Sequence, residues 1–532
     1  MTNRTDELNL RHKIKTRDEL IEAIASRPRA KKVIMCHGTF DLVHPGHVRH
    51  LLYAKTKADL LIASLTSDAH ITKGNFRPYV PQDLRAMNLA ALEVVDYVII
   101  DDNPTPLSNI RAIQPDYFAK GYEYGSGEVP IQTREEMAAL AEYGGEIIFT
   151  PGDIVFSSSK FIENTPPDIA NDKLHMLMES AGISFDDLRE AVRRLSGTRV
   201  HVLGDTIVDS YMYCDPISSG SAKSPTLSVR LINQVDYSGG AAVVAKHLRA
   251  AGAEVVFSTL LGDDSWRDFV LNDLCEAGIT CRPIVDATRP TTQKHVFIAK
   301  NHRLLKFDKV DNRPIGANML DEFQRHLAES NTTDVFVFSD FRHGIFNRKT
   351  IPSLTEAIPE GRMRVADSQV ASRWGNILEF QGFDLITPNE REARFALGDQ
   401  DSVIRPLALD LYQKAKCKLL ILKLGDRGTI TYQAPSPVVR SFFTLDSFAR
   451  HVVDPVGAGD ALLSYSTLAF AAGQDPVIAS IIGSIAAGVA CCIDGNRPIE
   501  PSTILERIDQ LEGEVCYTVN FEPPTAPHRQ AA

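Results

Sequence analysis

The sequence predicts two consecutive α/β domains, and three observations lead to this prediction. At 532 residues the chain is too long for one ordinary hydrophobic core. Short apolar runs alternate with helical stretches, a rhythm typical of parallel sheets covered by helices. The rhythm breaks at the paired prolines of residues 164–168, because proline continues neither a helix nor a central strand. We therefore expect a first domain over residues 1–165, a linker over 166–184, a second domain over 185–515 and a tail over 516–532.

The elements of both domains follow from the same pattern of apolar runs. In the first domain we expect helices at residues 17–26 and up to about 57, and strands at 32–36, 58–65, 96–100, 116–121 and 145–150. In the second we expect a helix at 185–195 and strands at 199–205, 254–262, 334–340, 363–368, 383–389 and 419–425. The stretch from about residue 215 to 305 is rich in strands and turns, which predicts a small β lid at one edge.

One apolar segment, residues 476–493, is long enough to suggest a transmembrane helix. It begins with Asp475-Pro476, a good helix start, and it is rich in small residues that suit close packing. We therefore predict a buried core helix.

Composition excludes several classes of function. A net charge of −11 argues against a nucleic-acid-binding surface, since phosphate backbones select basic faces. The eight cysteines form no Cys-x-x-Cys pair, which favours reduced, buried thiols over disulfides or a zinc site. The first twenty residues contain no apolar signal-peptide core. We expect a cytoplasmic protein with neither a membrane nor a nucleic-acid partner.

The most informative segment of the first domain is Gly38–His47, with the sequence GTFDLVHPGH. It follows an expected strand and opens an expected helix, so the backbone N–H groups of Gly38 and Thr39 can point at a phosphate. His44 and His47 are three residues apart, which places both imidazole rings on one helix face. Two such rings can donate hydrogen bonds to an α-phosphate as negative charge develops on it. The segment therefore predicts nucleotidyl transfer, usually with Mg²⁺.

This segment resembles the signature of cytidylyltransferase-like nucleotidyltransferases, and residues 73–98 resemble the adenylyltransferase half of bacterial bifunctional ADP-heptose synthases. The resemblance covers residues 12–163 and implies a Rossmann-like nucleotidyltransferase domain that uses ATP. It implies nucleotide contacts for Gly38, Thr39, Phe40, Asp41, Gly46, Lys73, Arg85, Ser157, Ser158 and Ser159. The alternative is a solvated surface cation for Lys73 or Arg85 and an ordinary helix N-cap for the serines.

The most informative segment of the second domain is Asp454–Asp460, with the sequence DPVGAGD, which runs into an expected helix. The backbone N–H groups of Gly457, Ala458 and Gly459 can stabilise charge on a transferring γ-phosphoryl group. Asp460 is then placed to accept the proton of a substrate hydroxyl as general base.

Together with GDTIVD (204–209), SGGAA (238–242), TPNEREAR (387–394) and LGDRGT (424–429), this turn resembles the ribokinase-like sugar kinases. The resemblance covers residues 185–515 and implies a ribokinase-like α/β domain whose lids often pair, hence a possible homodimer. It implies nucleotide contacts for Asn389, Gly425, Asp426, Gly428, Asp454 and the turn 457–459, and a Mg²⁺ ligand in Glu392. On the sugar side it implies Asp205, Asp209, Gly239 and Gly240, although a turn or cap role is the alternative for either aspartate alone.

Within that family the best resemblance is to the heptose 7-phosphate kinase half of the same synthases, with three departures on the sugar side. Val243 stands where the family has asparagine, Asp367-Ser368-Gln369 replaces Asp-Pro-Lys and so loses a cation, and Lys223 lies in an altered segment, 222–225. An exchanged charge in a sugar pocket can change which ligand is accepted. The domain order is also the reverse of that in the common heptose enzymes.

The resemblance implies two consecutive reactions, ATP-dependent phosphorylation of heptose 7-phosphate at the anomeric hydroxyl and nucleotidyl transfer that gives ADP-heptose and pyrophosphate. The product would feed lipopolysaccharide and other cell-surface glycans. One alternative keeps both chemistries with another sugar and CTP as the nucleotide. A second alternative is a kinase fold that acts only as a non-catalytic sugar sensor.

Overall fold

The computed structural model describes residues 10–71, 77–121, 130–150, 170–217, 228–300, 302–369, 376–434, 441–493 and 495–519. The chain forms two compact units, Met1–Met176 and Leu177–Ala532. The division falls inside the expected linker, where helix α7 (Ala170–Ala181) lies. The proline pair expected to mark the boundary lies outside the described residues. Helix α17 (Pro501–Val519) runs past residue 516, where we expected the tail to begin.

The first unit contains one six-stranded parallel sheet with the strand order β1-β4-β3-β2-β5-β6. Its strands are β1 (Ile14–Lys15), β2 (Val33–Gly38), β3 (Leu60–Thr66), β4 (Tyr97–Asp101), β5 (Tyr117–Gly121) and β6 (Glu146–Thr150). Its helices are α1 (Arg17–Ile24), α2 (Pro45–Lys55), α3 (Gln82–Ala90), α4 (Leu107–Ile113) and α5 (Ile131–Ala141), with 3₁₀ turns η2 (Leu10–Lys13) and η3 (Asp68–His70). Each strand expected in this unit is present.

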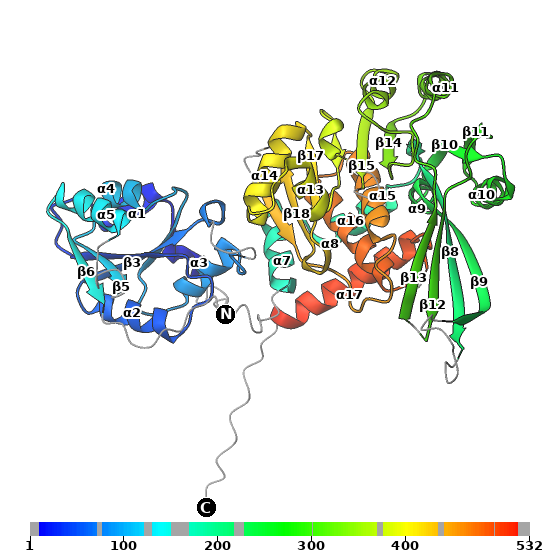
Figure 1. The fold of residues 1–532 in the computed structure, drawn as a ribbon. Coiled ribbons are helices and arrows are strands. Elements are labelled where there is room, and N and C mark those ends of the chain that lie inside the picture. Colours follow the sequence, from blue (N-terminus) through cyan, green and yellow to red (C-terminus); the bar gives the residue numbers. More distant parts are fainter. Residues whose placement is uncertain are drawn as a thin grey trace, which may run out of the picture. The chain divides into compact units, whose positions relative to one another are not determined.

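Helices cover both faces of this sheet (Figure 1). Alternate residues of β2 point to opposite faces: Val33 and Met35 pack with α1, α4 and α5, whereas Ile34 and Cys36 pack with α2 and α3. The strand order reverses at β2, whose neighbours are β3 and β5. Ligands of open parallel sheets bind at the carboxyl ends of the strands beside such a reversal. The turn that follows β2 lies at this position.

The second unit contains a nine-stranded sheet with the order β11-β10-β7-β14-β15-β16-β17-β18-β19, in which the β17–β18 and β18–β19 pairs are antiparallel and the other pairs are parallel. Its strands are β7 (Arg199–Gly204), β10 (Glu254–Gly262), β11 (Thr280–Asp286), β14 (Val335–Asp340), β15 (Met363–Ser368), β16 (Leu385–Ile386), β17 (Leu419–Lys423), β18 (Thr429–Gln433) and β19 (Phe442–Leu445). Its further helices are α8 (Phe185–Arg193), α9 (Ala241–Ala250), α10 (Ser265–Glu276), α11 (Ala317–Ala328), α12 (Thr350–Glu356), α13 (Glu390–Leu397), α14 (Ile404–Ala415), α15 (Ala458–Ala471) and α16 (Pro476–Cys491), with 3₁₀ turns η5 (Ile377–Glu379) and η6 (Gly425–Arg427).

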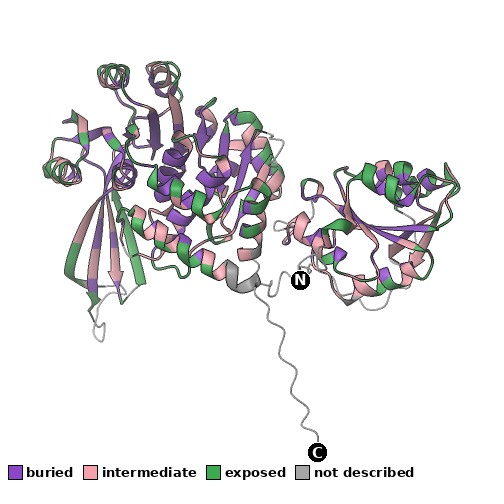
Figure 2. Ribbon diagram, turned by 180° about the vertical axis from the view of Figure 1, so that it is seen from behind, coloured by how far each residue is buried: buried purple, intermediate pink, exposed green. Residues whose placement is uncertain are grey.

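Helices α11 to α14 pack on one face of this sheet around an aromatic-rich core. Helices α15 and α16 pack against each other, and most of their residues are buried (Figure 2). Asp475 caps α16 by accepting a hydrogen bond from the Val477 N–H, as the sequence suggested. A side chain on Gly483 would overlap the hydroxyl of Ser466, so glycine allows α16 to approach α15 closely. The prediction of a buried core helix is confirmed, and among the described residues no helix meets the requirements for spanning a membrane.

The lid is a separate four-stranded sheet with the order β13-β12-β8-β9. Its strands are β8 (Thr206–Pro216), β9 (Val229–Gly240), β12 (Gln293–Ala299) and β13 (His302–Lys309). The expectation of one continuous lid over residues 215–305 was wrong. The chain makes two hairpins into the lid and between them returns to the body through α9, β10, α10 and β11, because those segments supply body strands and the helices that cover them.

Candidate active sites

The turn after β2 brings the two histidines of the first unit together, as predicted. His44 is the extended N-cap of α2, and its Nδ1 accepts a hydrogen bond from the Gly46 N–H at 3.1 Å. His47 lies one turn later, and its Nδ1 is 3.1 Å from the carbonyl oxygen of Leu42. The two rings stack with their centroids 3.9 Å apart. Each Nδ1 is therefore occupied by main chain, and Nε2 is the atom that each ring can offer to a ligand.

These main-chain partners make the two rings chemically unequal. Because a backbone N–H donates to Nδ1 of His44, the neutral ring carries its proton on Nε2 and offers a donor there. A carbonyl can only accept, so the proton of neutral His47 sits on Nδ1 and its Nε2 is a bare acceptor. We expected both rings to donate; in the neutral state only His44 does so.

Burial keeps both rings neutral in the absence of a ligand. It lowers the pKa of His44, and it lowers the pKa of His47 to about 4, with a further contribution from His44. A bound phosphate would act in the opposite direction, because a nearby negative charge favours the imidazolium form. His47 can therefore become a second donor when it gains a proton on ligand binding.

Gly46 has a local reason to be glycine. A Cβ atom there would lie 2.9 Å from Cε1 of His44 and 3.0 Å from its Nδ1. The close approach that we expected at Gly46 is therefore to the ring of His44. Similarly, Phe40 has φ 48° and its ring packs against Gly38 and His47. Gly38, Phe40 and Gly46 thus shape the turn from within.

Two residues assigned to nucleotide contact instead brace this turn. The Asp41 carboxylate is fully buried and accepts from the backbone N–H groups of Tyr79 and Val80 at 3.0 and 2.8 Å. The Arg85 side chain is 0% exposed, and its guanidinium binds the carbonyl oxygens of Thr39, Thr66 and Val80 and the Asp68 carboxylate. Neither side chain can reach a triphosphate from here, because its polar atoms are enclosed by the segments that it ties together.

Sequence reasoning missed polar side chains at the same sheet edge. His37 on β2 contacts Ser64 Oγ at 2.9 Å and Thr66 Oγ1 at 3.2 Å, and Lys120 at the end of β5 pairs with Glu136. Histidine and lysine near the ends of adjoining parallel strands were the available signal. Lys73 and Ser157 to Ser159 lie outside the described residues.

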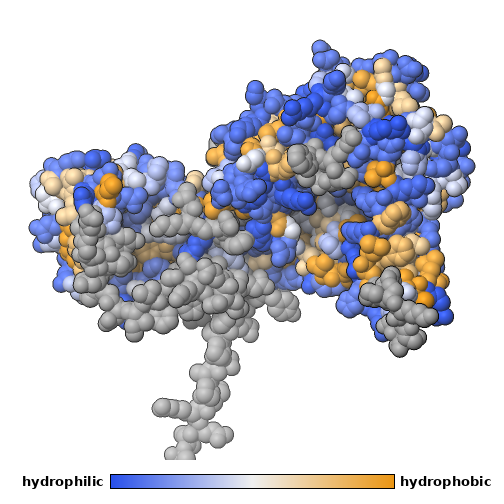
Figure 3. Space-filling view, in the orientation of Figure 1, coloured by the Kyte–Doolittle hydropathy of each residue, from blue (hydrophilic) through white to orange (hydrophobic). Residues whose placement is uncertain are grey.

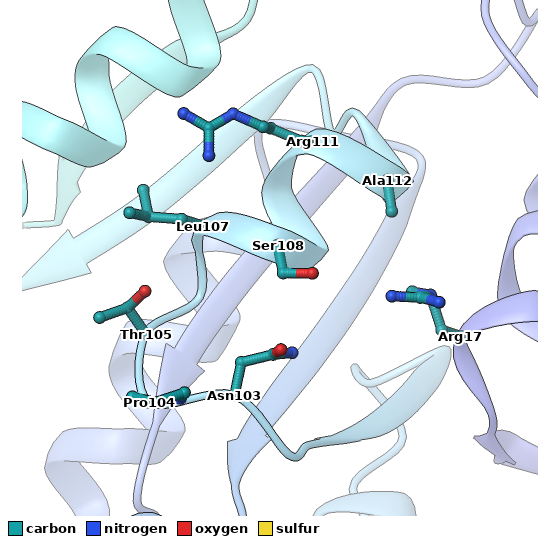
Figure 4. Close-up of a pocket in the computed structure, with 8 residues that line it drawn as sticks. All are labelled: Arg17, Asn103, Pro104, Thr105, Leu107, Ser108, Arg111 and Ala112. Atoms are coloured by element: carbon teal, nitrogen blue, oxygen red, sulfur yellow. The ribbon is translucent and has the colours of Figure 1, made fainter.

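One pocket of about 600 Å³ opens beside α4 (Figure 4). It is lined by Arg17, Asn103, Pro104, Thr105, Leu107, Ser108, Arg111 and Ala112. It contains none of the predicted site residues and lies by β4, two strands away from β2 in the sheet. The histidine turn, unlike this pocket, lies where the strand order reverses.

In the second unit, the glycine turn leads directly into α15. Gly457 is the N-cap of α15 with φ 83°, a left-handed conformation that favours glycine. Among the described residues, no acceptor is bound to the backbone N–H groups of Gly459 and Asp460 in the first helical turn. Asp460 itself is 9% exposed. The predicted donors were the N–H groups of Gly457, Ala458 and Gly459, but the Ala458 N–H donates to the Pro455 carbonyl oxygen at 3.4 Å.

Asp460 belongs to a cluster of buried charges. Burial, with a smaller contribution from the Asp367 carboxylate, raises the pKa of Asp460 to about 7, and the Lys423 ammonium opposes the rise. Burial likewise raises the pKa of Glu392 to about 7 against the effect of Lys423. A carboxylate that titrates near neutral pH is well matched to general base catalysis.

Asn389 and Glu392 form a capping box at the start of α13. The Asn389 side chain accepts from the Glu392 N–H at 2.9 Å, and both Glu392 carboxylate oxygens accept from Asn389 at 2.7 Å. The capping box lies at the edge of the sheet, because Asn389 pairs with Lys423 of β17. No group of three or more metal-ligating side chains is present among the described residues.

Asp209 and Gly239, both predicted to contact the sugar, lie next to each other. A side chain at Gly239 would overlap the Asp209 carboxylate, so glycine leaves the space that this carboxylate fills. Burial raises the pKa of Asp209 to about 6, and Lys294 opposes this shift. Gly240 has φ 61° and caps α9 against the Asp205 carbonyl.

Two residues assigned to the sugar do not face it. Asp205 is 2% exposed, and one carboxylate oxygen accepts from the N–H groups of Phe341 and His343 at 3.0 and 3.2 Å. It therefore braces the loop after β14. Val243 is 0% exposed within α9, so an apolar residue there fills the core and offers no surface to a ligand. Lys223 lies outside the described residues.

Asp454 links the turn to the lid. Its carboxylate is 2.7 Å from Nη2 of Arg303 on β13 and 3.5 Å from the Tyr211 hydroxyl on β8. It also accepts from the Val456 N–H at 3.1 Å. This carboxylate therefore joins the lid to the phosphate turn, and the nucleotide contact predicted for it stays a prediction.

The remaining predicted nucleotide residues, Gly425, Asp426 and Gly428, form the turn between β17 and β18. Gly428 has φ 78°, and a side chain there would overlap the Leu445 carbonyl. Gly428 therefore shapes this turn through its backbone conformation.

Sequence reasoning missed Lys423 and Asn496. Lys423 ends the otherwise apolar strand LLILK and pairs with Asp367 at 3.1 Å, so the cation expected to be lost beside Asp367 is supplied from another strand. A charge at the end of a buried strand was the signal. Asn496 lies between Gly239 and Gly457, within a short GNRP segment that gave no such signal.

Comparisons with known proteins agree with this division. A model of the pfkB family of carbohydrate kinases matches residues 198–502, and a cytidylyltransferase-like model matches residues 35–164. The bifunctional protein HldE of Pelobacter propionicus is 26% identical over 58% of this chain and 62% of its own length. That of Caulobacter sp. is 30% identical over 57% of this chain and 61% of its own length. The chain thus matches about six-tenths of the length of these relatives.

A shorter stretch of 123 residues is 46% identical to the bifunctional protein HldE of Campylobacter concisus, over 23% of this chain and 26% of that protein. Among solved structures, phosphofructokinase-2 from Escherichia coli in complex with substrates and products aligns with a TM-score of 0.50 and 16% identity, over 59% of this chain and all of that chain. The predicted fold class, a Rossmann-like unit followed by a ribokinase-like unit with a β lid, is confirmed.

Proposed function

Because the chain belongs to the pfkB family of carbohydrate kinases and also carries a cytidylyltransferase-like unit, we propose that it activates a sugar in two steps. The second unit transfers the γ-phosphoryl group of ATP to heptose 7-phosphate at its anomeric hydroxyl. The product is a heptose 1,7-bisphosphate, whose 7-phosphate must be removed by a separate phosphatase. The first unit joins the adenylyl group of ATP to the resulting heptose 1-phosphate and releases pyrophosphate. The names of the relatives support two activities in one chain.

One observation carries the kinase half of the proposal: Asp460, a buried carboxylate with its pKa raised to about 7, stands beside N–H groups that bind no acceptor. Such a carboxylate can take the proton of the attacking hydroxyl while the N–H groups stabilise charge on the phosphoryl oxygens. In the nucleotidyl half, the stacked rings of His44 and His47 supply the equivalent support for the α-phosphate. When bound, Mg²⁺ would neutralise phosphate charge, and Glu392 would hold it directly or through water.

The test is an assay of the full chain with heptose 7-phosphate, Mg²⁺ and either ATP or CTP, followed by mass spectrometry. With ATP alone we expect heptose 7-phosphate to give heptose 1,7-bisphosphate and ADP, and heptose 1-phosphate, added in a second reaction, to give ADP-heptose and pyrophosphate. A CDP-sugar, or turnover only with another sugar phosphate, would favour the alternative substrates. ATP that stays intact with every acceptor would favour the sugar-sensor alternative and contradict the proposal.

We further propose that the chain forms a homodimer through its lid. Leu305 and Phe307 lie two residues apart on β13, hence on one face, and are 59% and 54% exposed. Phe297 and His295 of β12 lie opposite them in register. Apolar side chains gather over this sheet (Figure 3). A second copy would cover the same face by symmetry. Light scattering should give the dimer mass, and L305K/F307K should give the monomer mass; a monomeric wild type would contradict this.

A further inference from the structure

Lys423 is an almost buried ammonium at the centre of the proposed kinase site. Its side chain is 16% exposed, and its Nζ lies 3.1 Å from Oδ1 of Asp367. The same Asp367 oxygen accepts from the Thr387 hydroxyl at 3.0 Å. A buried lysine destabilises the folded state unless its charge is paired, so a lysine at the end of this buried strand suggests a functional role.

The carboxylates around Lys423 outnumber it. Glu392 and Asp460 both interact electrostatically with the ammonium in addition to Asp367. Its backbone is fixed, because the Lys423 N–H donates to the Pro388 carbonyl at 2.8 Å and the residue pairs with Asn389. The side chain therefore extends from a rigid strand end into a group of three acidic side chains.

The ammonium also stands over the first turn of α15. A Cβ atom at Gly459 would lie 3.2 Å from Nζ of Lys423. On the other side of the turn, a Cβ atom at Gly457 would overlap Oδ1 of Asn496, a 6% exposed side chain whose Oδ1 finds no hydrogen-bond partner among the described residues. A cation, two N–H groups without acceptors and an unsatisfied amide thus surround one small space. These are the features of a site for a polar ligand that carries negative charge.

We propose that Lys423 contacts the transferring γ-phosphoryl group and stabilises its charge, an inference that rests on the kinase function proposed above. The acceptor hydroxyl oxygen forms a bond to the γ-phosphorus as its proton passes to Asp460. The bond from the γ-phosphorus to the bridging oxygen breaks, and its electron pair leaves with ADP. Lys423 then exchanges part of its contact with Asp367 for the phosphoryl oxygens, and keeps its proton throughout.

The test compares Lys423→Met and Lys423→Arg with the wild-type chain, with Lys418→Met as a matched control, because Lys418 lies on the same segment but is 75% exposed. We expect Lys423→Met to lower kcat for acceptor-dependent ADP release about a hundredfold or more. The KM for the sugar should change less than threefold, and Lys423→Arg should recover part of kcat. ADP with aluminium fluoride, which mimics the transferring group, should bind the wild type more tightly than ADP alone, and Lys423→Met should lose that gain.

A purely structural role for Lys423 predicts different results. If Lys423 only neutralises Asp367, then adding Asp367→Asn to Lys423→Met should restore kcat, and that result would overturn the inference. A Lys423→Met variant with wild-type kcat would also overturn the inference. The same holds if aluminium fluoride tightens ADP binding to this variant as much as it does to the wild type. Thermal melts of each variant identify loss of folding. A wild-type chain without acceptor-dependent ADP release would overturn the proposed kinase function, and this inference with it.

Discussion

The two proposed phosphate sites are built from different kinds of chemical groups. The histidine turn of the first unit offers neutral groups that main-chain contacts hold in place, and burial lowers the pKa of both rings. The α15 turn of the second unit lies among buried charges, with Lys423 facing Asp367, Glu392 and Asp460. The first site depends mainly on the geometry of one short segment, whereas the second depends on the balance of charge among segments far apart in the sequence.

This difference suggests how each site fails. A change in the histidine turn should act by misplacing or removing a donor, without changing the ionisation of a cluster of charged neighbours. A change at the α15 turn should also disturb the ionisation of its neighbours, because low-dielectric surroundings strengthen every interaction among them. The following predictions probe this contrast, from the largest expected effect to the smallest.

Asp460→Asn should lower acceptor-dependent ADP release about a thousandfold, because the loss of a general base typically costs 10²–10⁴ in rate. Coupled-enzyme assays of ADP release will measure the fall. The same preparation, given a preformed sugar 1-phosphate, should release pyrophosphate at the wild-type rate. Unchanged ADP release would remove Asp460 from the chemistry and take the α15 turn out of the comparison.

His44→Ala and His47→Ala should each lower pyrophosphate release about a hundredfold, as expected when one donor to a developing charge is removed. The kinase step should be unaffected. The exposed His175 of α7 provides the control, and His175→Ala should match the wild type in both assays. Equal rates for all three variants would show that the stacked rings do not contact the reacting phosphate.

The pH profiles of the two half-reactions should differ. Burial raises the pKa of Asp460 to about 7, and a general base acts only when ionised, so kcat/KM of the kinase half should fall about tenfold per pH unit below pH 7. It should level off above that pH. The nucleotidyl half has no such group among its paired histidines, whose pKa values are lowered. Rates measured from pH 5.5 to 9 (roughly the range over which such groups titrate) will separate the curves, and a kinase profile without an acidic limb would contradict the assignment of Asp460.

Arg303→Ala should have the smallest effect. It removes the lid partner of Asp454, a contact between a partly exposed cation and a buried carboxylate. A loss of about 1 kcal/mol corresponds to roughly fivefold in the KM of the acceptor, with kcat little changed. Arg230→Ala, on an exposed part of the same lid, is the control. An unchanged KM would mean that closure of the lid does not depend on this pair.

The sequence predicted most of the fold and the two phosphate turns, because these features depend on local patterns. Apolar alternation located each expected strand, and the contiguous GTFDLVHPGH and DPVGAGD segments carry their own turn and helix start. Polar residues near those turns were harder to interpret. Asp41 and Arg85 looked like ligands to phosphate, but their partners are carbonyl and N–H groups of segments up to 46 residues away along the chain.

The missed residues follow the same reasoning. No residue near Lys423 in the sequence indicates its contact with Asp367. The two side chains meet only because β15, β16 and β17 adjoin in the sheet. Asn496 likewise meets Gly239 and Gly457 only after folding. We expected the two lid hairpins as one continuous lid segment, because a strand-rich sequence does not indicate which sheet each strand joins.

Each unit encloses its own apolar interior, with the clusters around β2 in one and the phenylalanine-rich cluster around Phe338 in the other. Exchanging the order of the two coding segments in a gene would therefore leave both interiors intact.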